Sequence, residues 1–174
     1  TYQWYKENTY YVDDSYDPGD RAQALIKANE TDKAMKAYNQ LSSEYRVSSF
    51  VPKALLRQGL VYYNGSENES ALIKFKKVAG DYPGTPEALQ AVSTARLIYI
   101  DLGRVDDYAK WVKQLDYVEV TDVDLDNTTY ESAEKQYLDN NTDKAIKQFN
   151  GYLNQFPNGI HTLQSHFYVA QLYY

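Results

Sequence analysis

The sequence repeats at a fixed stride of 37 residues. The segment from Asn29 to Ala34 returns as Asn140 to Ala145, three strides further along the chain. Stepping by 37 gives three apolar columns: Ala34, Ala71, Tyr108 and Ala145; then Tyr38, Phe75, Val112 and Phe149; then Leu41, Val78, Leu115 and Tyr152. Within each repeat these positions are spaced i, i+4 and i+7, which is typical of the buried face of a helix.

Each repeat is predicted to contain another helix, which precedes the one just described and is therefore the first helix of the pair. One of its columns contains Ala22, Gly59, Arg96, Ala133 and Ala170, and another, three residues later, contains Leu25, Tyr62, Tyr99, Gln136 and Tyr173. Gln136 interrupts this column, with Tyr137 next to it. Thr31, Thr85 and Thr142 can act as N-caps, whereas the Pro83-Gly84 pair and Pro157 end helices.

These signals predict nine helices, and no strand pattern competes with them. The helices are expected at residues 19–28, 31–46, 52–63, 67–82, 86–102, 104–117, 125–139, 142–156 and 160–173.

The residues of one repeat resemble those of a known family. Leu55, Gly59 and Tyr62, followed by Ala71, Phe75 and Pro83, reproduce the spacing of the tetratricopeptide repeat, although Gln58 replaces its usual leucine. The length of 37 residues and the Tyr-Pro or Phe-Pro helix ends are similar to bacterial cell-envelope members, such as the Tol-Pal coordinator and the outer-membrane assembly lipoproteins. The resemblance implies an all-α, right-handed α–α superhelical solenoid, in which helix pairs stack into one continuous core.

A single solenoid domain is expected over residues 19–174. Its repeat units lie near 19–46, 52–82, 86–118 and 125–156, followed by an unpaired final helix at 160–173. The third unit carries Tyr108 in place of alanine and is followed by an acidic loop, so we expect distorted stacking there. Residues 1–18 are rich in tyrosine and contain Trp4, which predicts that part of this segment packs on the first repeat.

Composition and charge exclude several classes of function. The chain has 18 Lys and Arg against 24 Asp and Glu, a net charge of −6, so it lacks the cationic surplus that nucleic-acid binding needs. It contains no Cys, hence no disulfide, thiolate metal site or cysteine nucleophile. No apolar run is long enough to insert into a membrane. Because the chain begins at Thr1, we expect any targeting signal to have been removed.

A partner-binding surface is expected on the first helix of each pair. In tetratricopeptide proteins these helices line a concave groove that receives a peptide or helix of another protein. The candidate groove residues are Leu56, Leu60, Tyr63, Leu97, Ile100, Tyr130, Tyr137, Phe167 and Tyr174. The alternative for each of them is packing between neighbouring repeats. The Lys, Arg and Asn clamp with which co-chaperones of the family grip a C-terminal carboxylate has no counterpart at the matching positions, so a partner with apolar anchors and basic ends would fit better.

Metal binding and catalysis have weaker signals. Asp122, Asp124 and Asp126 match the opening ligands of a calcium loop, but its glycine is replaced by Asn127 and its bidentate Glu by Ala133. The alternative is that these aspartates bind no metal and belong to a solvated acidic loop, in which Asp124 or Asp126 caps the next helix. His161 and His166 are five residues apart and would point away from each other on a helix. We therefore predict neither a metal nor another cofactor.

The prediction that follows is a non-catalytic scaffold that binds another protein or peptide. The resemblance places it in the periplasm or at the outer membrane, with a cytoplasmic location left open. An alternative is a glycan-binding or nutrient-capture module, because exposed Tyr and Trp beside Asp and Asn also suit sugar rings. The final helix, whose outer face carries Ala170 and Tyr173 without a neighbour, favours self-association through the C-terminal end.

Overall fold

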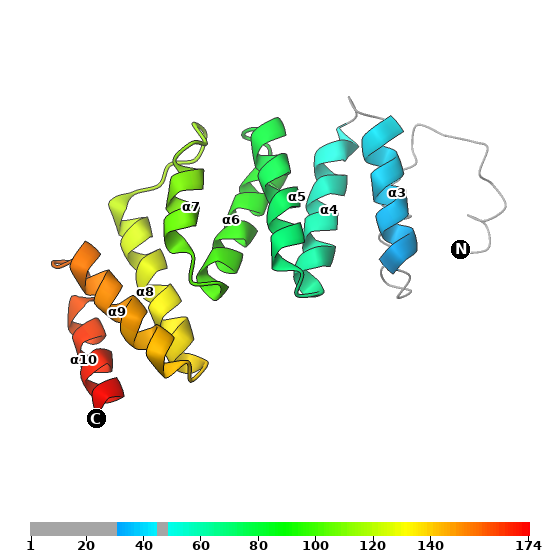
Figure 1. Cartoon of the computed structure of the whole chain (residues 1–174). Helices are drawn as coiled ribbons and strands as arrows, with labels where there is room; N and C mark the ends of the chain where they lie inside the picture. Colours follow the sequence, from blue (N-terminus) through cyan, green and yellow to red (C-terminus); the bar gives the residue numbers. More distant parts are fainter. Residues whose placement is uncertain (1–30, 45–48) are drawn as a thin grey trace.

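The computed structural model describes residues 31–44 and 49–174, and within these ranges it contains eight helices and no strand (Figure 1). The helices are α3 (Thr31–Glu44), α4 (Phe50–Asn64), α5 (Asn68–Asp81), α6 (Pro86–Asp101), α7 (Val105–Val112), α8 (Asp122–Leu138), α9 (Thr142–Gln155) and α10 (Thr162–Tyr173). The all-α prediction is confirmed for these residues. The predicted helix at 19–28 and the aromatic segment at 1–18 lie outside the described residues.

Most helix ends agree closely with the sequence signals, although Thr142, expected as an N-cap, is the first residue of α9 and Asn141 is its N-cap. At the start of α6, the Thr85 hydroxyl accepts a hydrogen bond from the Ala88 N–H and Pro86 follows it, as predicted. The chain leaves α5 at Tyr82, immediately before Pro83, and enters the left-handed region at Gly84, where φ is +74°. The short turns that result place consecutive helices side by side in chain order (Figure 1).

Two predicted helices have the wrong limits. The helix expected at 104–117 is α7, which ends at Val112, because the following residues form tight turns instead. In this segment the Tyr117 hydroxyl donates to the Ala79 carbonyl at 2.8 Å, and the neighbouring apolar side chains pack on the core. The helix expected at 125–139 is α8, which begins at Asp122, because Thr121 caps it.

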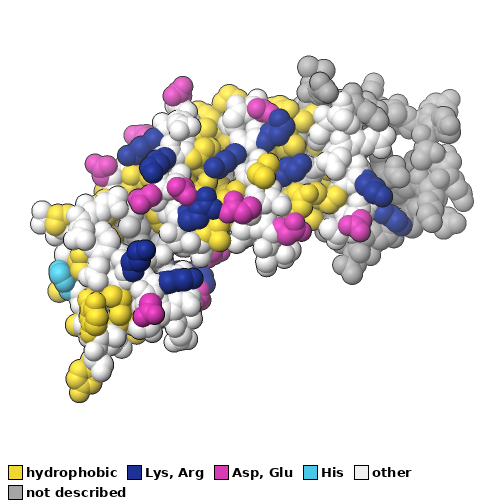
Figure 2. Space-filling model, in the orientation of Figure 1, with side chains coloured by type: hydrophobic (Ala, Val, Ile, Leu, Met, Phe, Trp, Pro, Cys, Tyr) yellow, Lys and Arg dark blue, Asp and Glu magenta, His cyan; other side chains and the backbone are white. Residues whose placement is uncertain are grey.

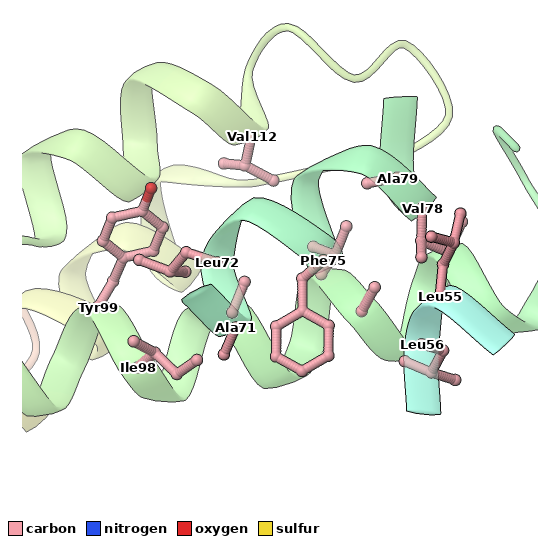
Figure 3. Close-up of a cluster of buried hydrophobic side chains, with 14 of the residues drawn as sticks. Leu55, Leu56, Ala71, Leu72, Phe75, Val78, Ala79, Ile98, Tyr99 and Val112 are labelled. Atoms are coloured by element: carbon pink, nitrogen blue, oxygen red, sulfur yellow. The ribbon is translucent and has the colours of Figure 1, made fainter. Parts of the chain in front are cut away.

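The apolar columns on the second helix of each pair are buried as predicted. Tyr38, Phe75, Val112 and Phe149 are each at most 1% exposed, and three of the four residues in the preceding column are completely buried. Leu115 is the exception, being only partly buried, because it follows the end of α7. Figure 3 shows Phe75 of α5 between Ala71 and the leucines of α4.

The buried apolar side chains form three separate clusters. The largest joins α4, α5, α6 and α7, a small one joins α3 to α4, and the third joins α8, α9 and α10. Polar contacts connect the helices of the first and third clusters. The Arg96 guanidinium of α6 donates to Glu131 at 2.6 Å and to the Thr128 hydroxyl at 2.9 Å on α8, while Ser132 Oγ donates to the Ile100 carbonyl.

Within the described ranges, no helix is both long enough and apolar enough to cross a membrane.

Candidate interaction surface

Among the described residues, α4, α6 and α8 are the first helices of predicted pairs, and α10 is the predicted unpaired final helix. Each presents a stripe to solvent. We use the name first-helix surface for the exposed and half-buried residues on α4, α6 and α8 that belong to these stripes. They are Lys53, Arg57, Leu60, Tyr63, Ser93, Leu97, Asp101, Glu134, Tyr137 and Leu138. Packing of α6 against both α4 and α8 makes the three stripes neighbours.

Three of the nine candidate groove residues are buried. Leu56, Ile100 and Tyr130 are 5%, 7% and 5% exposed, respectively. Leu56 belongs to the central cluster and Tyr130 to the C-terminal one. These three side chains have little surface left for a partner.

The other six candidates are accessible to different degrees. Leu60, Tyr63 and Tyr137 are half-buried, while Leu97 is 47% exposed. Phe167 is 63% exposed and Tyr174 fully exposed, both at the α10 end. The accessible candidates therefore lie partly on the first-helix surface and partly on α10.

Aromatic rings fix the junction of α8, α9 and α10. The Tyr168 ring of α10 lies 4.6 Å from Tyr137 and 5.2 Å from Phe149, measured between ring centroids. These contacts bury part of Tyr137 and hold α10 in position. They also explain why Tyr137 is only half available to a partner.

Tyr130 is the centre of a polar network in this region. Its hydroxyl donates to Glu134 Oε1 at 2.7 Å, and its ring stacks on His161 with the centroids 4.0 Å apart. Burial raises the pKa of the Tyr130 hydroxyl well above its ordinary value, and the hydrogen bond to Glu134 adds to this. His161 Nε2 is in turn 2.8 Å from the Asn127 side-chain oxygen. The imidazole thus has a structural role between α8 and α10.

The three aspartates of the calcium candidate have separate structural roles. Asp122 is the first residue of α8, and Asp124 accepts hydrogen bonds from the Thr121 N–H and hydroxyl in a capping box. Asp126 is not solvated, because it is buried and accepts from the Tyr152 hydroxyl at 2.7 Å and the Ile160 N–H at 3.1 Å. In the part of the chain that the structure describes, no group of three or more His, Asp or Glu side chains could hold a metal ion.

A cleft of about 540 Å³ lies away from the first-helix surface, where α7 faces α8 and α9. Polar and charged side chains line part of it: Lys144, Lys147 and Gln148 come from α9, and Arg104 and Asp106 from the start of α7. Arg104 is paired with Asp107 and Glu69. These charges of both signs do not define a ligand.

Trp111, the tryptophan within the described residues, is half-buried. Its ring lies 6.3 Å from both Tyr99 and Tyr108, and the Lys76 ammonium sits over it at 5.6 Å. It is therefore not an open platform for a sugar ring.

Sequence reasoning missed the charged and apolar ends of the first-helix surface. Lys53 and Arg57 are exposed on α4, and Leu138 at the end of α8 is 66% exposed. The 37-residue stride could have predicted that Leu138 is exposed. The same step connects it with Asp101 and Asn64, which are polar residues at the ends of α6 and α4.

A comparison with known protein families finds a helical-repeat match over one of the predicted repeats. Residues 53–85 match the family model described as tetratricopeptide repeat, a stretch that contains nearly all of α4, all of α5 and the cap of α6. This match supports the tetratricopeptide family, whose members are generally non-enzymatic interaction scaffolds. It does not support the bacterial cell-envelope resemblance.

A second family model matches residues 1–36 and describes the C-terminal part of the pyruvate ferredoxin oxidoreductase beta chain. Only residues 31–36 of this stretch, the start of α3, are described, and the match covers too little of the chain to show the family. No curated protein matches the chain. The repeat itself suggests a scaffold for protein–protein interaction.

Proposed function

We propose that the chain is a right-handed α–α superhelical solenoid with repeats of 37 residues that binds a partner peptide or helix through the first-helix surface. Burial at equivalent positions supports the repeat length: the column of Tyr38, Phe75, Val112 and Phe149 is buried on α3, α5, α7 and α9. Stacked pairs leave one side of each first helix for a partner.

The observation that carries the proposal is the apolar surface exposed on these helices. Leu97 is 47% exposed and Leu138 66% exposed, on neighbouring helices whose other sides are buried. Contiguous exposed apolar patches rimmed by polar residues mark protein interaction sites. Nothing in the described residues points to catalysis.

The test is a selection of binders from a display library of random 12-residue peptides. Each recovered peptide is then titrated against Leu97→Asp and Leu138→Asp variants. We expect at least tenfold weaker binding by both, since a charge in an apolar contact leaves it desolvated and unpaired. The matched control is Ile73→Asp, because Ile73 is 67% exposed but lies on α5, a second helix. If all three variants bound the peptides as tightly as the wild type, the first-helix surface would be excluded as the binding site.

We also propose self-association through α10, whose outer face is apolar. Leu163 is 85% exposed and Phe167 63%, and Figure 2 shows apolar side chains gathered over this end of the molecule.

A location in the periplasm or at the outer membrane rests on the sequence resemblance alone. Cell fractionation of the natural host with an antibody against the chain would test it.

A further inference from the structure

We propose that the first-helix surface binds an extended partner segment that is acidic at one end and basic at the other, with its acidic end over α4. This inference rests on the proposed function and adds the chemistry and orientation of the partner.

The α4 end of the surface is positive. Lys53 and Arg57 are exposed one helical turn apart, and α4 contains no carboxylate. Neither side chain forms an ion pair with another described residue; the Lys53 ammonium lies only over the Phe50 ring, 5.8 Å from its centroid. Two such cations on one exposed face attract a partner's carboxylates.

The α8 end is negative. Of the five carboxylates of this helix, Asp122, Asp124 and Asp126 lie near its start, outside the surface. Its single basic residue, Lys135, is paired with Asp139. Glu131 is neutralised by Arg96 of α6, but among the described residues Glu134 has only the Tyr130 hydroxyl as its partner. Glu134 therefore keeps its charge uncompensated beside Tyr137 and Leu138.

The middle of the surface contains an apolar pair. Leu60 on α4 and Leu97 on α6 are one stride of 37 residues apart and therefore occupy equivalent positions. Leu60 is half-buried against the central cluster, whereas Leu97 projects further into solvent. A partner side chain placed between the charged ends would contact these leucines.

The spacing fixes the size of the partner segment. Packed helices are about 8–10 Å apart, so α4 and α8 are separated by about 20 Å with α6 between them. An extended chain spans this distance with about six residues at 3.3–3.6 Å each. Acidic and basic residues of the partner should thus be about six positions apart, with an apolar residue between them.

The same display selection tests the inference. Peptides recovered on the wild-type chain should share Asp or Glu at one end, Lys or Arg at the other, and an apolar residue in between. A Lys53→Glu/Arg57→Glu variant should bind such a peptide at least tenfold more weakly. A peptide whose acidic end is changed to Lys should regain the lost affinity on that variant and should bind the wild type poorly.

The matched control is Lys144→Glu/Lys147→Glu. It changes the net charge by the same amount, but both lysines are exposed on α9, outside the first-helix surface. If the two variants lose affinity equally, or if the recovered peptides show no separation of charge, the inference is wrong while the proposed function stands. If no peptide binds the wild-type chain, both are wrong.

Discussion

Gln58 shows how one residue can depart from a repeat pattern and still fit its fold. The usual leucine is replaced by a glutamine that is completely buried. Its amide nitrogen donates to the Asn39 side-chain oxygen at 2.9 Å, which links α4 to α3, while its own oxygen has no partner among the described residues. Gln58 therefore ties the small cluster of α3 to the central one at the expense of an unsatisfied buried oxygen.

Gly59, the next residue, is required by close packing. A Cβ added there would overlap the Phe75 ring, which lies in the fully buried core. We expect Gly59→Ala to lower the free energy of unfolding by about 1–3 kcal/mol, because a packed aromatic ring has to move. Urea denaturation followed by circular dichroism measures this change.

A second glycine provides the control for this prediction. Gly151 is exposed within α9, and a Cβ there would meet no atom within 4 Å. Gly151→Ala should raise the free energy of unfolding by about 0.5–1 kcal/mol, because alanine loses less backbone entropy on folding. A Gly59→Ala variant that is stabilised, as Gly151→Ala is expected to be, would contradict the packing assigned to Gly59.

At the scale of helices, the sequence predicts an element well where the apolar stripe is continuous. The stripe defines α5 and α9 to within one residue at each end. It fails for α7, because the helix is ended by tertiary contacts, including that of Tyr117 with Ala79. It also fails at the start of α8, where the first apolar core residue, Leu125, lies three positions after the true beginning.

The same limit applies to the candidate site. Both sides of the first helices carry apolar residues, and periodicity alone does not show which side the next helix pair covers. Leu56 and Leu60 are one turn apart, yet the first is buried and the second half-buried. The cationic end at Lys53 and Arg57 was missed because those residues lie outside the apolar columns.

The capping box of α8 makes a pH-dependent contribution to stability. Hydrogen bonds from the Thr121 hydroxyl and N–H lower the pKa of Asp124 below its ordinary value of 3.8. The folded state thus favours the charged carboxylate. Its contribution to the free energy of unfolding is complete above the unfolded pKa of 3.8, and it is lost as the pH falls through the lower pKa of the folded state.

We expect Thr121→Ala to lower the free energy of unfolding by about 1 kcal/mol at neutral pH. Asp124→Asn should also be destabilising at neutral pH, and its difference from the wild type should shrink well below pH 3.8. Urea unfolding at both pH values tests this. Asp122→Asn is the control, since it removes a carboxylate from the same helical turn outside the capping box. Equal effects of the two aspartate variants would show that only the helix dipole matters.

At the scale of the whole molecule, polar contacts separate the two larger clusters. Arg96 bridges α6 to α8 through Glu131 and Thr128, and the cleft lies beside the same junction. Ion pairs of this kind are weaker than apolar packing when they are partly exposed. The group of α8, α9 and α10 is therefore joined to the rest of the row less firmly than its own helices are joined to each other.

The distribution of charge over the chain argues for contact between copies at α10. The chain carries a net charge of −6, so most pairs of surfaces from two copies repel each other. Residues 148–174 contain no Lys, Arg, Asp or Glu, and two copies can meet there without placing like charges together. The exposed Leu163, Phe167 and Tyr173 would then leave water.

We therefore expect a concentration-dependent dimer in sedimentation velocity experiments. Leu163→Asp/Phe167→Asp should shift it to the monomer, because each copy would place two carboxylates in an apolar contact. Ile73→Asp/Val123→Asp adds the same charge at exposed apolar positions, 67% and 56% accessible, on α5 and α8. This control should dimerise like the wild type, apart from a small general repulsion that 0.15 M salt largely screens. A wild-type chain that sediments as a monomer at every concentration would rule out the contact, and equal dissociation of both variants would place it elsewhere than α10.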